Sequence, residues 1–162
     1  MIYETNEDMC RKNTAIKVLS YDDMQNLLMS FKKEPGLILG DYVEGDIIDI
    51  LENAMSCMPA VLVEGRADGE KAAVTAAEIT VRSVLNIISS YSYKYIVINC
   101  IIDENISFDA FLEAEAFIKR TIVDLYNKSI IFMLTVKSDI ISNFALFDII
   151  ISGVDGECIN HI

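Results

Sequence analysis

Apolar residues occur along this chain in short runs separated by Asp, Glu, Lys and Asn. None of these runs reaches the roughly 18 uncharged residues of a membrane-spanning helix, whereas their lengths suit strands. The runs predict strands over residues 15–19, 37–39, 60–64, 93–102, 130–136 and 145–151. Because the longer runs are apolar at consecutive positions, we expect a sheet that is covered by helices on its faces.

Four further segments carry apolar residues at spacings of three and four, which predicts amphipathic helices. They cover residues 21–33, 46–57, 70–89 and 108–126. Ser20 and Ser107 precede two of these helices as N-caps, and Asp68 is the expected N-cap of a third, after a turn at residues 65–69. The element order predicts an α/β protein of the α+β two-layer kind, with a mixed, mainly four-stranded sheet packed against helices. We expect the third helix to cross between parallel strands, and the short link between the last two strands predicts a hairpin.

Composition narrows the class of protein. The length of 162 residues suits about one domain, and the net charge of -12 leaves no basic stripe for nucleic acid or an anionic membrane. The acidic first residues lack the apolar segment of a signal peptide, so we expect a cytoplasmic protein. Its four cysteines have no C-x-x-C spacing, and its one histidine is His161. The cysteines are therefore interpreted as small buried hydrophobes, and neither a histidine metal site nor a Ser-His-Asp triad is expected.

Several pieces of the chain resemble, in the right order, the C-terminal domain of the FtsZ/tubulin family. The segment DIIDILENAMSCM, from Asp46 to Met58, is similar to the FtsZ pattern D-F-A-D followed by V-M-S-x-M. The next stretch, AVLVEGRADGE from Ala60 to Glu70, looks like the FtsZ strand and turn A-M-M-G-x-G-R-A-S-G-E. Weaker matches follow in the Ala-Ala-Glu of the next helix, in IVINC and FDAF, and in the last two apolar runs. The resemblance covers about residues 41–154 and implies a domain of this kind without the GTP-binding domain.

The resemblance also suggests how the rest of the chain is organised. Residues 1–13 are expected to be a flexible N-terminus, and residues 155–162 a tail. Residues 14–40 are expected to form a β-α extension that packs on the core, because the apolar face which the GTPase domain covers in FtsZ needs a substitute cap or a partner. The glycine-rich GTP-binding signature of the family is absent from this sequence. GTP is therefore expected only through a partner subunit, and no cofactor or metal for this chain alone.

The candidate chemistry lies at the start of the helix over residues 46–57. In the family, the loop here (the T7 loop) places two acidic residues against the nucleotide of the next subunit, where they polarise the attacking water. By that resemblance Asp46 and Asp49 are the catalytic pair, acting in trans, although Glu44 replaces the family's asparagine. From the residues alone, Asp46 is better explained as a carboxylate that stabilises a helix N-terminus. Arg66 and Glu70 are interpreted as an exposed turn held by a salt bridge.

Three functional hypotheses follow. The first is an FtsZ-like cytoskeletal interaction domain, connected with cell division, that docks on a filament-forming partner or on itself. The second is a domain of a split or larger GTPase, in which Asp46 and Asp49 complete a site in another subunit. The third is an unrelated α/β domain that binds a small molecule. On the first hypothesis the protein is not itself an enzyme, and on the second it contributes to GTP hydrolysis only in trans.

Overall fold

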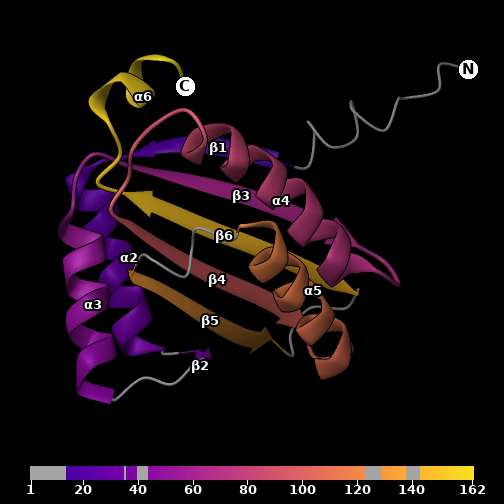
Figure 1. Ribbon diagram of the computed structural model, residues 1–162. Coiled ribbons are helices and arrows are strands. Elements are labelled where there is room, and N and C mark those ends of the chain that lie inside the picture. The colour runs from indigo at the N-terminus through magenta and orange to yellow at the C-terminus, as the bar shows by residue number, and fades with distance from the viewer. Residues whose placement is uncertain (1–13, 35, 40–43, 123–128, 138–142) are drawn as a thin grey trace, which may run out of the picture.

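A mixed six-stranded sheet forms the centre of the computed structural model, which describes residues 14–34, 36–39, 44–122, 129–137 and 143–162 (Figure 1). The strand order across the sheet is β1-β3-β6-β4-β5-β2. Neighbouring strands are antiparallel except β4 and β5, which are parallel. The strands are β1 (Thr14–Leu19), β2 (Leu37–Leu39), β3 (Ala60–Asp68), β4 (Tyr95–Asp103), β5 (Ser129–Lys137) and β6 (Phe144–Ser152).

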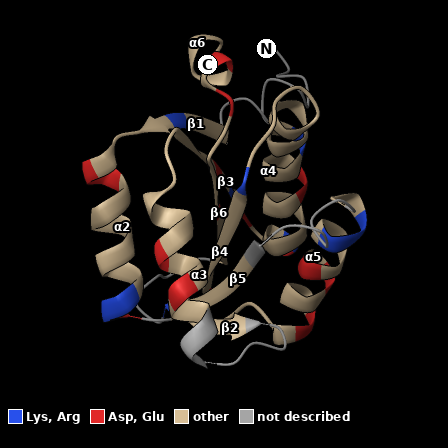
Figure 2. Ribbon diagram, turned by 60° about the vertical axis from the view of Figure 1, so that its left-hand side comes forward, with Lys and Arg blue, Asp and Glu red and all other residues tan. Residues whose placement is uncertain are grey.

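Helices cover both faces of this sheet. They are α2 (Tyr21–Lys33), α3 (Glu44–Ser56), α4 (Ala72–Ile88), α5 (Phe108–Thr121) and the short α6 (Gly156–Asn160). Figure 2 shows the sheet between α2 and α3 on one side and α4 and α5 on the other, with acidic positions on both helical layers. The predicted mixed α/β class is confirmed, but the sheet has six strands rather than mainly four, and the described part of the chain forms three layers rather than two.

Alternate residues of the central strands enter two separate cores. In β4, Ile96 and Ile98 pack with α4 and α5, whereas Val97 packs with α2 and α3. This explains why the strands are apolar at successive positions, since both of their faces are buried against helices. The α2–α3 core also contains Met24 and Leu28 from α2, so the segment predicted as an extension contributes buried side chains.

The start of α2 follows the predicted capping pattern. The Ser20 hydroxyl accepts a hydrogen bond from the backbone N–H of Asp23 at 3.0 Å, and the Asp23 carboxylate accepts one from the Ser20 N–H at 3.0 Å. These reciprocal bonds form a capping box. Hydrogen bonds from the Ser20 backbone and side chain lower the pKa of Asp23. Ser107 likewise caps α5 by accepting a hydrogen bond from the Ala110 N–H at 3.1 Å, as predicted.

The turn predicted at residues 65–69 is wrong, because β3 continues to Asp68. Its second half stays extended through pairing with β6, and the last pair is Asp68 with Phe144. Gly65 therefore serves close packing rather than a turn. A Cβ atom on Gly65 would lie 1.9 Å from the Thr80 hydroxyl oxygen of α4. Lys71, and not Asp68, is the N-cap of α4, and it makes no side-chain capping hydrogen bond.

The predicted hairpin of the last two strands is also wrong. β6 lies between β3 and β4 and is antiparallel to both, while β5 lies on the other side of β4. β3 and β4, which α4 connects, consequently run in the same direction with one strand between them. The central place gives β6 a paired neighbour on each side, and its side chains Ile149, Ile150 and Ile151 are all buried. A hairpin at the sheet edge would leave one side of such an apolar strand open.

The remaining differences concern the ends of elements. α3 begins at Glu44, two residues before the predicted start, and α5 ends at Thr121 with Ile122 as its C-cap. The predicted continuation of that helix over 123–126, and the predicted flexible residues 1–13, lie outside the described residues. Cys100 and Cys158 are buried as predicted, and burial raises the pKa of both thiols, whereas Cys57 is only partly buried and Cys10 lies outside the described residues. No helix in the described ranges combines the length and apolar character needed to cross a membrane.

Candidate functional site

The predicted catalytic residues lie in the first two turns of α3. The side chain of Asp46 lies outside the described part of the structure, so its geometry with Asp49 is not assigned. Asp49 is exposed to solvent. Residues three apart on a helix share a face, so the backbone of α3 allows both carboxylates to be presented together. A catalytic role in trans for Asp46 and Asp49 stays a prediction.

The predicted salt bridge between Arg66 and Glu70 is not formed. The Arg66 guanidinium lies 3.6 Å from the carboxylate of Asp68 and 4.5 Å from the centre of the Phe144 ring. Alternate residues of a strand point to the same face, so Arg66 and Asp68 lie side by side once β3 extends through them. Arg66 thus covers an aromatic ring at the end of the sheet, where it makes an exposed ion pair and a cation–π contact.

A row of three polar residues crosses the sheet on the face that α2 and α3 only partly cover. These helices pack at the end of the sheet where β4 begins and β6 ends (Figure 1). At the middle of the strands, Glu64 of β3 pairs with Asp148 of β6, and Asp148 pairs with Asn99 of β4. Glu64, Asp148 and Asn99 occupy the same face as Leu62, Ile150 and Val97, which belong to the α2–α3 core. We call them the polar row.

The electrostatics of the polar row are dominated by the two neighbouring carboxyl groups. Burial, together with the hydrogen bond and negative charge of Glu64, raises the pKa of Asp148 to about 7. The Oδ1 atom of Asp148 is enclosed and has no hydrogen-bond partner. Directly opposite residues of antiparallel strands have Cα atoms about 5 Å apart, so two ionised carboxylates repel strongly here. Near neutral pH the pair retains one proton, or else another cation takes the place of that proton.

Sequence reasoning missed the polar row, although each member left a signal. Asn99 and Asp148 are each a polar residue with apolar neighbours on both sides, and Glu64 directly follows the apolar residues 60–63. Polar groups are rarely placed in buried strands without a partner, so such interruptions mark positions to consider for a site. Their meeting in space depends on the placement of β6 between β3 and β4, which was not predicted.

An apolar cavity of about 440 Å³ lies between α2, α3, β2 and β5. It is lined by Phe31, Lys32, Ile38, Ile47, Ile48, Leu51 and Met133. The Lys32 ammonium group is hydrogen-bonded to the Glu52 carboxylate at 2.5 Å. The cavity falls in the size range of small-molecule sites, about 300–1,000 Å³, but offers few polar groups that would orient a ligand.

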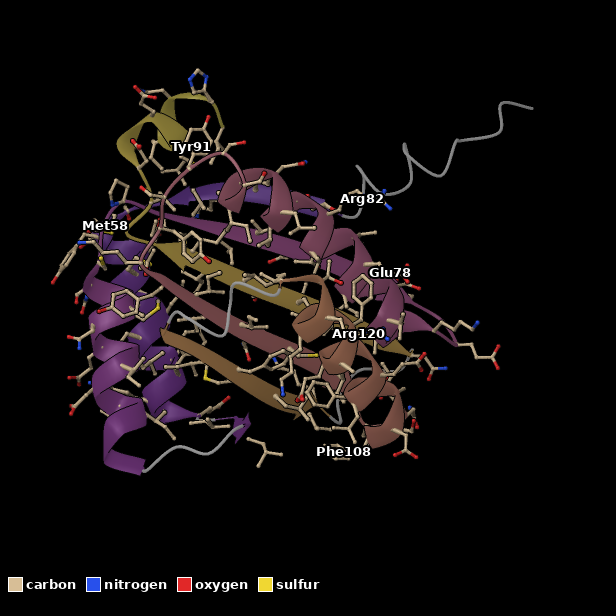
Figure 3. All side chains as sticks on the ribbon, viewed as in Figure 1. Met58, Glu78, Arg82, Tyr91, Phe108 and Arg120 are labelled. Atoms are coloured by element: carbon tan, nitrogen blue, oxygen red, sulfur yellow. The ribbon has the colours of Figure 1, made fainter. Side chains whose placement is uncertain are left out.

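Exposed apolar side chains gather near the β5–β2 edge on the α5 side of the sheet. Leu37, Phe108, Leu112 and Val136 are 57%, 52%, 39% and 56% exposed. Phe108 and Leu112 are one helical turn apart on α5, and Figure 3 shows Phe108 at the end of α5 opposite Arg120. Leu37 pairs with Leu134 and thus shares its face of the sheet, as does Val136 two residues further along β5. We call these four residues the α5-edge patch.

The described architecture defines a class: a mixed α/β fold similar to part of the FtsZ/tubulin fold. Among the solved structures that it resembles are those of FtsZ of M. jannaschii. An FtsZ dimer structure matches with a TM-score of 0.56 and 21% identity, covering 78% of this chain and 34% of that chain. A structure of a point mutant of the same FtsZ matches with a TM-score of 0.55 and 22% identity, covering 78% and 36%.

These matches confirm the predicted resemblance at the level of the fold. The chain spans about a third of the length of the FtsZ structures it matches. No protein-family profile matches the sequence. No curated protein matches it either.

Proposed function

We propose that this chain is an FtsZ-like assembly domain that docks on a filament-forming protein partner and binds no nucleotide by itself. The observation that carries the proposal is the fold, which is similar to FtsZ over 78% of this chain while taking in about a third of the FtsZ chain. One of the similar structures is an FtsZ dimer, so the fold occurs in a self-associating protein. A role in a cytoskeletal or cell-division process follows from the same likeness.

The surface supports docking through the α5-edge patch. Exposed apolar residues scattered singly are ordinary, but a group of them on one edge is typical of an interaction site. Phe108 contacts Phe111 with ring centres 5.8 Å apart, and Phe111 in turn contacts Phe132 of β5 at 5.9 Å. The patch is therefore continuous with the rigid core, so a partner bound there meets a preformed surface.

Sedimentation with FtsZ from the same organism, with GTP present and GTP turnover recorded, tests the proposal. We expect the chain to pellet with FtsZ polymer or to change its amount. The double variant Phe108→Ser and Leu112→Ser should lose most of this effect. Met29→Ser is the control, because Met29 is an exposed apolar residue on α2 in the opposite helical layer. Absence of any effect of the wild-type chain on FtsZ, together with a monomeric chain, would refute the proposal.

The second candidate function, completion of a GTPase site in trans, is favoured by the solvent exposure of Asp49. An exposed carboxylate near the start of α3 is available to a nucleotide held by a partner. In the sedimentation assay, Asp46→Ala and Asp49→Ala should leave pelleting intact under both proposals. Only the second predicts that they abolish a stimulated rate of GTP hydrolysis.

A further inference from the structure

The polar row brings three side-chain oxygen donors together on one face of the sheet. Asp148 is the middle member, flanked by Glu64 and Asn99 on the adjoining antiparallel strands. Directly paired residues on such strands have Cα atoms about 4.5–5.5 Å apart, which allows the outer side chains to lean over the central one. The three side chains can therefore bring their oxygen atoms close together at the middle of the sheet.

Asp148 is hydrogen-bonded to Glu64, but one of its carboxylate oxygens and the neighbouring Asn99 amide are not accounted for by that bond. Asn99 is only 9% exposed, and its side chain makes no hydrogen bond to any residue in the described ranges. The Oδ1 atom of Asp148 has no partner either. Buried polar groups in folded proteins nearly always have a partner. An enclosed carboxylate oxygen without a partner, beside a largely buried amide, therefore indicates a bound group at this position.

Within the described ranges, basic side chains do not neutralise the two carboxylates. On the neighbouring part of β3, Arg66 is engaged with Asp68 and with the Phe144 ring. On β1, Lys17 has its ammonium group 3.9 Å from the Asp23 carboxylate. Neither Glu64 nor Asp148 makes an ion pair within the described ranges. A pair of like charges that is partly shielded from solvent is costly unless a proton or another cation compensates it.

We propose that Glu64, Asp148 and Asn99 bind a hard divalent cation, Mg²⁺ or Ca²⁺, through their side-chain oxygens. Carboxylate and amide oxygens suit these ions, whereas Zn²⁺ and Cu²⁺ favour nitrogen and sulfur ligands. Two carboxylates are few donors for such an ion, so the site needs the Asn99 amide as a third. The described ranges contain no group of three or more His, Cys, Asp or Glu residues placed to bind a metal. The remaining coordination positions are taken by water.

Isothermal titration calorimetry on the chelator-treated full chain, with Mg²⁺ and Ca²⁺ in separate runs, tests the site. We expect one saturable site per chain with Kd of about 0.1–1 mM, as for cation sites with few charged ligands. Glu64→Gln and Asp148→Asn should each weaken binding at least tenfold. The matched control is Glu78→Gln, which removes one exposed charge from α4 on the other side of the sheet (Figure 3) and should leave Kd unchanged. Runs at about 0.15 M salt suppress weak binding to the acidic surface.

Two results would overturn the inference: absence of saturable binding to the wild-type chain, or equal binding by Glu64→Gln and wild type. Either would mean that the carboxyl pair is compensated by a proton alone. Circular dichroism shows whether Asp148→Asn is folded. If it is not, Glu64→Gln decides the question, because Glu64 is half-buried and its amide has nearly the same shape. The test involves no FtsZ, so its outcome is independent of the docking proposal.

Discussion

Gly65 is predicted to be essential for the packing of α4 on β3, and replacement by alanine tests this. A Cβ atom at this position would lie 1.9 Å from the Thr80 hydroxyl oxygen, 3.0 Å from its Cβ atom and 3.2 Å from the Ala76 carbonyl oxygen. The Thr80 hydroxyl is buried and donates a hydrogen bond to the Ala76 carbonyl at 2.5 Å. Gly65→Ala therefore forces Thr80 out of its place and moves the helix away from the strand.

The size of the destabilisation by Gly65→Ala follows from these contacts. Overpacking of a core costs about 1–3 kcal/mol, and loss of a buried hydrogen bond costs a similar amount. Replacing glycine by alanine also reduces the conformational entropy of the unfolded chain, which offsets about 0.4–1 kcal/mol of this loss of stability. We therefore expect Gly65→Ala to lower the free energy of unfolding by about 3 kcal/mol, which lowers Tm by about 6–12 °C for a chain of this size.

Urea unfolding followed by circular dichroism measures the effect, and a double-mutant cycle identifies its cause. Thr80→Ala removes the hydroxyl and should recover at least about 1 kcal/mol in the Gly65→Ala background. Gly156→Ala is the control, because no atom lies within 4 Å of an added Cβ there. If Gly65→Ala is no less stable than Gly156→Ala, or if Thr80→Ala recovers nothing, the packing argument is refuted.

Three further predictions follow from features described above. Ser20→Ala should lower the free energy of unfolding by about 1 kcal/mol through loss of the α2 capping box, and an unshifted urea midpoint would contradict this. Because the pKa of Asp148 is raised in the folded state to about 7, its contribution to stability is full below pH of about 4 and is lost as pH rises to 7. Thermal melts of wild type and Asp148→Asn without divalent ions should therefore diverge over this window, whereas parallel curves would contradict the shift. A chain starting at Gly40 should aggregate or dimerise on size-exclusion chromatography, since it lacks Met24 and Leu28 of the core; unchanged stability and an unchanged oligomeric state would show that residues 14–39 are dispensable.

Local signals in the sequence were sufficient for most helices. The start of α2 depends on Ser20 and Asp23, which are three residues apart and interact with each other's backbone. Such contacts do not depend on the rest of the fold, so the local sequence is sufficient to predict them. The same holds for Ser107 at the start of α5.

Long-range pairing decided what the sequence did not predict. Gly65 and Gly69 look like turn residues locally, yet pairing with β6 keeps β3 extended as far as Asp68. The polar row has the same origin, because Glu64 and Asp148 are far apart in sequence and meet only through the register of β3 and β6. For Asp46 and Asp49 the resemblance to FtsZ suggested a role, while the fold comparison bears on the architecture alone.

The first two strands in the described part of the chain, β1 and β2, occupy the two opposite edges of the sheet. The partner of β1 is β3, but Leu37 of β2 pairs with Leu134, near the other end of the chain. During synthesis, residues 37–39 therefore emerge long before β5, the strand that receives them, and the sheet is complete only once the central strand β6 has followed β5 out of the ribosome. Until then an apolar tripeptide is exposed to other chains and to chaperones, so the yield of native protein should depend on the rate of translation through β5 and β6.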